Sequence, residues 1–444
     1  MTAERKRIGL NEVRALGAGE MVWDSAVSGF GARRQKSEAI AYVLLYRTTD
    51  GRQRWHTIGR HGAPWTPSEA REEARRLLGE VVKGADPAGV KKAKREAATV
   101  AELCDLYLAD AEAGRLLTRR GGTKKASTLA TDRSRIDAHI RPLLGSMKVP
   151  AITRGDVEGF MHRVADGGTK RRAATGRKRG VSNVRGGRGA ASRTVGLLGA
   201  LFTYAVRKGL RADNPVQGVT RYADGRRERR LADAEYGALG AGLAKSALPR
   251  PPAESRRKDG SPRSALWPAA IAAARFLALT GWRSGEALGL TWGQVDLARR
   301  TARLQDTKTG LSVRPLSRAA CDVLRAQNSG GADALVFPAT RGGGRMTGFP
   351  SLFARITNAG DLPADVTPHV LRHSFASLAA DLGYSEPTIA ALVGHKGHSV
   401  TSRYVHSADA VLLAAADVVA DRMAEMMGEA IKAKVVPLPR RAAG

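Results

Sequence analysis

The sequence predicts a multidomain α+β protein in which helices outnumber strands. The chain has 444 residues, which is too long for one ordinary hydrophobic core. β-rich runs stand out at 39–59 and 301–317, and amphipathic helical patterns fill much of the remainder. We therefore expect three domains: a small sheet-plus-helix domain, a helical domain, and a mainly helical domain with a small antiparallel sheet.

The first predicted domain covers residues 1–84. Its run at 39–59 consists of two β-rich stretches about an Asp-Gly turn, which supplies the positive φ values of a tight hairpin. A helix follows, because Thr66 and Glu69 have the spacing of a capping box. Residues 85–98 lack apolar periodicity, and we assign them to a linker.

The second predicted domain, residues 99–218, is helical. Thr99 and Glu102 form another capping box at its start. Four amphipathic stretches give it four predicted helices, at 100–114, 127–140, 153–166 and 192–209.

A basic segment, residues 167–193, separates the last two of these helices. It contains nine Lys or Arg residues, many glycines and no acidic residue, so it cannot build a hydrophobic core. Such dense like charge repels itself unless a polyanion neutralises it, so we predict a flexible arm that contacts phosphates; a solvated loop is the alternative. The predicted DNA-binding residues are Lys170, Arg171, Arg172, Arg177, Lys178, Arg179, Arg185, Arg188 and Arg193.

The third predicted domain covers residues 231–430, after a polar linker at 219–230 and before a tail at 431–444. It has an apolar helix that stops at Gly281, then the hairpin-like run at 301–317, and then helical patterns to its end. A Pro-rich and charged insertion interrupts it near 250–263, and its role is open.

The charge of the chain points to a polyanionic partner. Lys and Arg number 73 against 42 Asp and Glu, giving a formal charge of +31 and a pI near 11.0. Nucleic acid is the first candidate and an anionic membrane is the rival, but no apolar run is long enough to span a bilayer and the N-terminus does not resemble a signal peptide. We expect a cytoplasmic, nucleoid-associated protein. Cys104 and Cys321 lie in apolar helical patterns, which predicts buried free thiols.

Six residues of the third domain have side chains suited to phosphoryl chemistry: Arg283, Lys308, His369, Arg372, His395 and Tyr404. An arginine holds two phosphate oxygens with its planar fork, histidine and lysine transfer protons, and a tyrosine hydroxyl can carry a phosphoryl group covalently. No carboxylate cluster is present to hold Mg²⁺. The set therefore predicts attack on a phosphodiester by positioning and fixed positive charge, with no metal and no other cofactor.

The motifs "TGWRSGE", "TKTG", "HVLRHSFAS" and "LVGHKGHSVTSRYVH", in this order, resemble those of the tyrosine recombinase, or phage integrase, family. The resemblance implies that Arg283 and Arg372 clamp the scissile phosphate and that Lys308 is the general acid for the leaving 5′ oxygen. Glu286, one turn beyond Arg283, is expected to orient its neighbours without touching substrate.

The same resemblance implies that His369 handles the proton of the nucleophile, that His395 adds a phosphate contact, and that Tyr404 is the nucleophile. The first domain is similar to an arm-site DNA-binding domain and the second to a core-site DNA-binding domain. The family then implies integration and excision of a mobile element such as a prophage, through a 3′-phosphotyrosyl intermediate and a homotetramer on double-stranded attachment-site DNA. An excisionase or a DNA-bending host factor is a possible further partner.

Several alternatives stay open at this stage. A type IB topoisomerase has a similar site, and a DNA-binding protein without activity would share the basic charge. A metal site built from His369, His373, His395 and His398 is another reading, although it would place arginines beside a cation. Tyr384 is the rival nucleophile. The helix predicted at 408–431 is expected to dock on a neighbouring protomer, with packing in its own protomer as the alternative.

Overall fold

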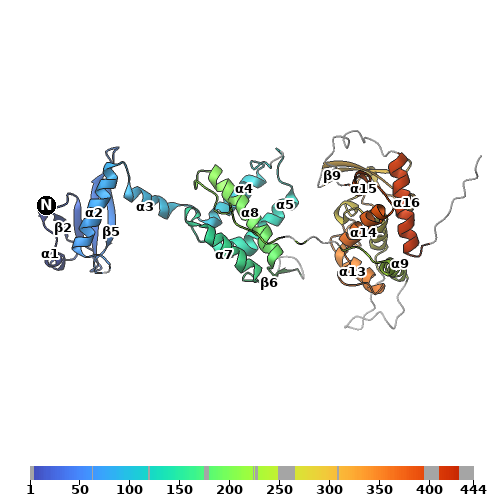
Figure 1. Ribbon diagram of the computed structural model, residues 1–444, viewed down its shortest axis with the longest axis horizontal. Coiled ribbons are helices and arrows are strands. Elements are labelled where there is room, and N and C mark those ends of the chain that lie inside the picture. The colour runs from blue at the N-terminus through green and yellow to red at the C-terminus, as the bar shows by residue number, and fades with distance from the viewer. Residues whose placement is uncertain are drawn as a thin grey trace, which may run out of the picture. The chain divides into compact units, whose positions relative to one another are not determined.

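The computed structural model describes residues 5–62, 64–118, 121–174, 180–223, 225, 229–248, 266–307, 310–394 and 410–429. The chain divides into two compact units, residues 1–225 and 226–444 (Figure 1). The described residues form three separate hydrophobic cores, two in the first unit and one in the second. No described helix is long and apolar enough to cross a membrane.

The N-terminal region is a five-stranded sheet covered by one long helix. Its strands are ordered β1-β2-β3-β4-β5; β1 and β2 are parallel and the other pairs are antiparallel. The elements are β1 (Arg5–Lys6), α1 (Leu10–Arg14), β2 (Met21–Asp24), β3 (Phe30–Arg34), β4 (Ile40–Arg47), β5 (Gln53–Arg60), α2 (Pro67–Val82) and α3 (Pro87–Glu96). The predicted hairpin is β4 and β5, and the Thr66–Glu69 capping box begins α2 as expected.

Helix α3 occupies most of the segment that we assigned to a linker. Its N-cap is Asp86, which also accepts a hydrogen bond from the Tyr46 hydroxyl, and Lys91 Nζ lies 3.1 Å from the Thr57 carbonyl of β5. No residue of α3 is buried, which is why the sequence shows no apolar stripe there. The domain boundaries themselves stay predictions.

The second core is helical. Its elements are α4 (Val100–Glu112), α5 (Ala126–Arg135), the π-helix η1 (Ile136–Ile140), α6 (Arg141–Leu144), the 3₁₀ turn η2 (Val149–Ala151), α7 (Arg154–Ala165), β6 (Arg171–Ala174), β7 (Val181–Val184) and α8 (Arg188–Arg207). Cys104 is buried in this core and Cys321 in the third, both as free thiols, as predicted.

The basic segment is more ordered than we predicted. Strands β6 and β7 pair in an antiparallel hairpin, and α8 begins at Arg188, inside the segment. The prediction of a flexible arm is therefore wrong for these described residues. Both strands are solvent-exposed apart from half-buried Val184, so the hairpin adds little to the core, in agreement with the composition.

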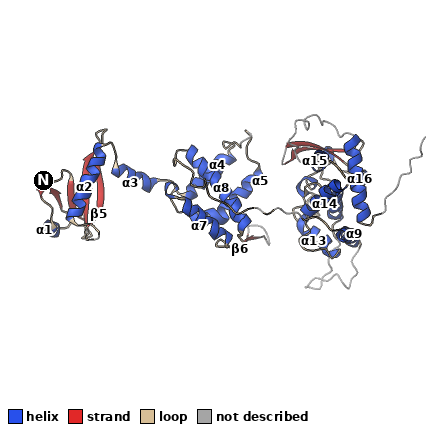
Figure 2. Ribbon diagram, in the orientation of Figure 1, coloured by secondary structure: helices blue, strands red, loops and turns tan. Residues whose placement is uncertain are grey.

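The C-terminal unit is mainly helical, with a small antiparallel sheet ordered β10-β9-β8. The elements are α9 (Asp233–Ala247), α10 (Pro268–Thr280), α11 (Ser284–Ala287), the 3₁₀ turn η4 (Trp292–Gln294), β8 (Val295–Asp296), β9 (Thr301–Thr307), β10 (Gly310–Pro315), α12 (Arg318–Arg325), α13 (Phe349–Ala359), α14 (Pro368–Asp381), α15 (Glu386–Val393) and α16 (Ala410–Met426). Figure 2 shows that strands are few in this unit and that helices make up its bulk. The predicted α+β fold class is confirmed.

Helix α16 packs within its own unit, against α9, α10, α12, α14 and α15. Val419, Ala420 and Met423 are fully buried there. Asp417 is also buried; it accepts two hydrogen bonds of 2.8 Å from Arg300 and one from the backbone N–H of Arg318. The expectation that this helix docks on a neighbouring protomer is wrong for residues 410–426, because its apolar face already has a partner in the same chain.

We expect Asp417→Ala to lower the free energy of unfolding of the C-terminal unit by about 3 kcal/mol, because it leaves the Arg300 guanidinium without its buried partner. Chemical denaturation followed by circular dichroism measures the change. Glu425→Ala is the matched control on the same helix, since its ion pair with Arg422 is exposed and should contribute less than about 1 kcal/mol. Equal effects of the two substitutions would contradict the anchoring role of Asp417.

Candidate active site

Arg283 lies at the junction of α10 and α11. Helix α10 ends at Gly281, whose φ of 60° is the left-handed conformation that favours glycine. A Cβ atom at Gly281 would also lie 2.8 Å from the ring of Phe375, so the chain turns here in contact with α14. Arg283 caps α11 and donates from Nη1 to Oε1 of Glu286 at 2.8 Å. The tight turn thus presents a half-buried guanidinium at the surface of the core.

Arg372 reaches the same turn from α14. Its side chain is buried, and Nη1 donates to the carbonyls of Gly281 at 2.9 Å and Val393 at 2.7 Å. The guanidinium therefore joins the C-terminal ends of α10 and α15, where the helix dipoles favour a positive charge. Its Nη2 is buried and has no hydrogen-bond partner among the described residues. A buried donor without a partner is costly in a folded protein, and an anionic ligand oxygen would satisfy it.

A third arginine, Arg314 of β10, belongs to the same cluster. It is fully buried, its Nη1 lies 3.0 Å from Oε2 of Glu286, and its guanidinium lies 5.1 Å from the ring centre of Trp282. Glu286 therefore has an arginine on each carboxylate oxygen, Arg283 on one and Arg314 on the other.

Mutual repulsion and burial shift the pKa values of this cluster. Burial, and then the charges of Arg283 and Arg314, lower the pKa of Arg372 to about 10, so it stays charged at neutral pH. Burial also lowers the pKa of Arg314. Burial alone would raise the pKa of Glu286, but its contacts with Arg314 and Arg283 hold it below the ordinary value. Three guanidinium charges against one carboxylate leave an excess positive charge, which favours binding of an anion.

His369 and His373 lie one turn apart on α14, as the spacing predicted. Their rings contact edge to face with centroids 4.5 Å apart. His369 is exposed, which is compatible with contact with a substrate, whereas His373 is half-buried. Leu371 and Phe375 are buried and fix the opposite side of the helix in the core. The helical register therefore places His369 on the outer face and Arg372 beneath the surface.

The predicted DNA-contacting residues are exposed wherever the structure describes them, namely Lys170, Arg171, Arg172, Arg185, Arg188 and Arg193. Arg171 donates to the Asp137 carbonyl at 3.0 Å, and the Arg188 guanidinium lies 5.6 Å from the ring centre of Tyr222. Arg177, Lys178 and Arg179 lie outside the described residues. The β6–β7 hairpin and its flanks, which we call the basic hairpin, thus present positive charge to solvent.

If the basic hairpin contacts phosphates, replacing Lys170, Arg172 and Arg185 with alanine should flatten the slope of log K against log salt by roughly 0.9 for each lost contact. Sequence preference should change little. Arg133→Ala is the control, because Glu112 already neutralises that exposed charge. Equilibrium DNA binding across a salt series measures the slopes, and a triple variant with the wild-type slope would rule out phosphate contacts by these side chains.

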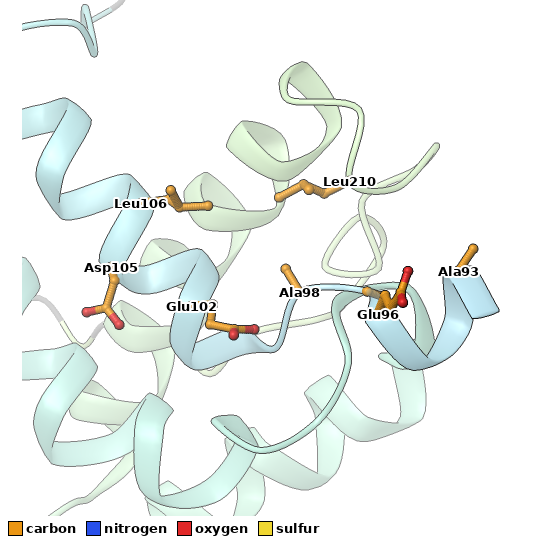
Figure 3. Close-up of a pocket in the computed structure, with 8 residues that line it drawn as sticks. Ala93, Glu96, Ala98, Glu102, Asp105, Leu106 and Leu210 are labelled. Carbon is orange, nitrogen blue, oxygen red and sulfur yellow. The ribbon is translucent and has the colours of Figure 1, made fainter. Parts of the chain in front are cut away.

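A surface cavity of about 610 Å³ lies in the first unit, near the start of α4 (Figure 3). It is lined by apolar and acidic side chains, among them Leu106 and Leu210 facing Glu96 and Glu102. Glu102 caps α4 through Thr99, and Asp105 pairs with Arg141. Both carboxylates thus have structural roles, and the cavity contains none of the predicted functional residues.

Comparison with known proteins identifies two regions of the chain. Residues 263–410 match the phage integrase family, and residues 11–94 match the arm DNA-binding domain. The chain carries a phage integrase family domain. The first match covers the arginine cluster, and the second covers most of the N-terminal sheet and helices α2 and α3.

The phage integrase domain has curated relatives. Tyrosine recombinase XerC of Roseiflexus castenholzii is 32% identical over 143 residues, which are 30% of this chain and 45% of that protein. Tyrosine recombinase XerC of Xylella fastidiosa is 30% identical over 131 residues, or 29% of this chain and 45% of that protein. The matching part of the chain thus spans less than half the length of these relatives.

Solved structures resemble a larger part of the chain. A lambda integrase dimer bound to a COC′ core site has a TM-score of 0.51 at 20% identity, covering 84% of this chain and 93% of that chain. A lambda integrase tetramer bound to a Holliday junction has a TM-score of 0.52 at 19% identity, covering 83% and 96%. These similarities show that this chain shares the fold of the two lambda integrase structures.

Three predicted site residues of the phage integrase domain, Lys308, His395 and Tyr404, lie outside the described residues. The structure brings Arg283, Glu286 and Arg372 together. Sequence reasoning missed Arg314. If the apolar residues of β10 faced the core, the alternation of side chains along the strand would expose Arg314. In the structure, Leu311 and Val313 are 54% and 39% exposed, and Arg314 is fully buried.

Proposed function

We propose that this protein is a tyrosine-type site-specific recombinase that cleaves and rejoins double-stranded DNA. The observation that carries the proposal is the arginine cluster of the phage integrase domain, in which the buried Arg372 keeps an unpartnered donor close to Arg283. A non-bridging phosphate oxygen is the anionic acceptor that such planar donors bind well.

In this proposal Arg283 and Arg372 hold the scissile phosphate and stabilise the negative charge that develops on it. The Tyr404 hydroxyl attacks the phosphorus and displaces the 5′ oxygen, so one phosphoester replaces another and no ATP is needed. His369 takes the proton of the nucleophile, Lys308 gives a proton to the leaving oxygen, and His395 adds a phosphate contact.

The proposed biological role is supported by the two family matches, to the phage integrase family and to the arm DNA-binding domain. The domain that resembles an arm DNA-binding domain would bind attachment-site arms, and the helical domain with the basic hairpin would bind the core site. Exchange between two duplexes requires four cleavages, so we propose a homotetramer on DNA that integrates and excises a mobile element such as a prophage at the bacterial nucleoid. An excisionase or a DNA-bending host factor would set the direction.

Nicked duplexes from the repeats that flank the element test this function. If cleavage occurs next to the nick, the short 5′-hydroxyl fragment diffuses away and a covalent protein–DNA adduct accumulates. We expect adducts on attachment-site duplexes and joined products when a second duplex is supplied. Relaxation of supercoiled DNA without joining between duplexes would indicate a topoisomerase, and binding without adducts would indicate a DNA-binding protein.

A further inference from the structure

Arg314 combines complete burial with incomplete pairing. Its Nε donates to Ser312 Oγ at 3.2 Å, and Nη1 lies 3.0 Å from Oε2 of Glu286. Nη1 is thus within ion-pair distance of Glu286, but neither Nη1 nor Nη2 has a well-formed hydrogen bond among the described residues. The side chain is closed off from solvent, so it does not reach a substrate directly.

Burial of such a charge should destabilise the fold. Replacing a buried ion pair with apolar residues of similar volume is often neutral or stabilising, and each unpaired buried N–H is a further penalty. Stability therefore gives no reason for an arginine at this position of β10. A functional reason is more consistent with its contacts.

The contact with Glu286 suggests what that reason is. Glu286 accepts two hydrogen bonds from Arg283, one on Oε1 from the side chain and one on Oε2 from the backbone N–H, and Arg314 also lies against Oε2. Without Arg314, the whole carboxylate charge would act on Arg283, and the fork of Arg283 could close on both oxygens. With Arg314 in place, the carboxylate is shared, and more of the positive charge of Arg283 is available to an anion.

Arg314 also contacts the end of α15. A Cβ atom at Gly394 would lie 2.1 Å from the Arg314 Cζ atom, so the guanidinium lies directly against the Gly394 backbone. Gly394 has a φ of 71° and ends α15, one residue after Val393, whose carbonyl accepts from Arg372. A single buried side chain thus contacts both Glu286, the partner of Arg283, and the helix end that holds Arg372.

We propose that Arg314 is a positioning residue for phosphate binding: it draws Glu286 away from Arg283 and supports the α15 terminus that orients Arg372. The inference rests on the proposed function, because its effect is on cleavage of a phosphodiester. Arg314 acts through the two phosphate-binding arginines and does not itself touch DNA.

The test compares four forms of the full chain in single-turnover adduct formation on the nicked duplexes: wild type, Arg314→Met, Glu286→Gln, and the double variant. Methionine replaces the apolar stem of the side chain and removes the guanidinium with its charge. We expect Arg314→Met to slow adduct formation by roughly 10- to 100-fold, as for other residues that orient a binding group. Arg314→Lys, which keeps the charge, should recover part of the rate.

Two further readouts separate positioning from a merely structural role. The melting temperature of Arg314→Met should stay close to that of wild type, because Glu286 keeps its hydrogen bonds from Arg283 when the buried and poorly paired charge of Arg314 is removed. The double variant should be faster than Arg314→Met by roughly tenfold, because Glu286→Gln removes the charge that would otherwise hold Arg283. A slower rate at close to wild-type stability, with this rescue, supports the proposal.

Other outcomes overturn it. A wild-type rate in Arg314→Met, or a parallel loss of melting temperature and rate with no rescue, would show that Arg314 has no positioning role. If wild-type protein itself forms no adduct while it binds the duplexes, the proposed function fails and this inference fails with it. Adduct formation by the wild-type protein thus distinguishes failure of the proposed function from failure of the positioning role of Arg314.

Discussion

Arg372→Ala should reduce adduct formation by roughly 10²- to 10³-fold, the effect of removing one preorganised donor from a developing anion. The reason is geometric: Nη1 is held by the carbonyls of Gly281 and Val393, which leaves the buried Nη2 for a phosphate oxygen. Arg372→Lys should not rescue the rate, because one ammonium group cannot satisfy two carbonyls and a phosphate in that planar arrangement. Affinity for DNA should fall far less, since the chain carries a net charge of +31.

Single-turnover adduct formation and equilibrium binding on the same duplexes measure the two effects. Arg325→Ala is the matched control, because it removes one arginine from an exposed position of α12 where Asp322 already pairs with it. Its rate should stay within about twofold of wild type. If Arg372→Ala loses affinity and cleavage rate in equal proportion, the arginine serves general DNA binding and not the phosphate at the point of cleavage.

Lys308→Ala should slow cleavage of ordinary DNA by roughly 10²- to 10⁴-fold, because a departing 5′ alkoxide needs a proton from a positioned acid. β9 ends at Thr307 and β10 begins at Gly310; Lys308 follows Thr307 in the sequence and lies outside the described residues. On a duplex whose bridging oxygen is replaced by sulfur, the leaving group is a thiolate with a conjugate acid of pKa about 8.5, by analogy with cysteine, and protonation is no longer required. The variant should then cleave the sulfur substrate at close to the wild-type rate.

Arg303→Ala, on β9 of the same hairpin, is the control for loss of a basic side chain in this region. Arg303→Ala should not slow cleavage of one of the two substrates more than cleavage of the other. A defect of Lys308→Ala that is equal on the oxygen and sulfur substrates would assign Lys308 to electrostatic binding of phosphate instead of proton transfer.

The sequence was sufficient to predict helix ends that depend on one short-range interaction. The Thr66–Glu69 and Thr99–Glu102 capping boxes begin α2 and α4, and Gly281 ends α10, because each signal depends on residues within one turn. The spacing of His369 and Arg372 likewise predicted their order on α14. Of these elements, α10 leads into Arg283, and α14 carries His369 and Arg372.

Features set by distant contacts were not predictable in the same way. Asp417 looks like an exposed helical acid in sequence, and only its contacts with Arg300 and the Arg318 backbone, about 100 residues earlier in the chain, show that α16 is anchored in its own unit. The inward orientation of Arg314 opposes the apolar pattern of β10: Arg314 lies against the carboxylate of Glu286, while Val313 stays partly exposed. Both features depend on residues that are distant in the sequence.

Mapping of the covalent adduct decides whether Tyr404 is the residue that attacks DNA. Adducts trapped on a nicked attachment-site duplex are digested with protease and nuclease, and the peptide that retains a nucleotide is sequenced by mass spectrometry. We predict a 3′-phosphate ester on Tyr404, with no adduct in Tyr404→Phe although that variant binds the duplex as tightly as wild type. A nucleotide on Tyr384, or adducts that persist in Tyr404→Phe, would show that another residue is the nucleophile.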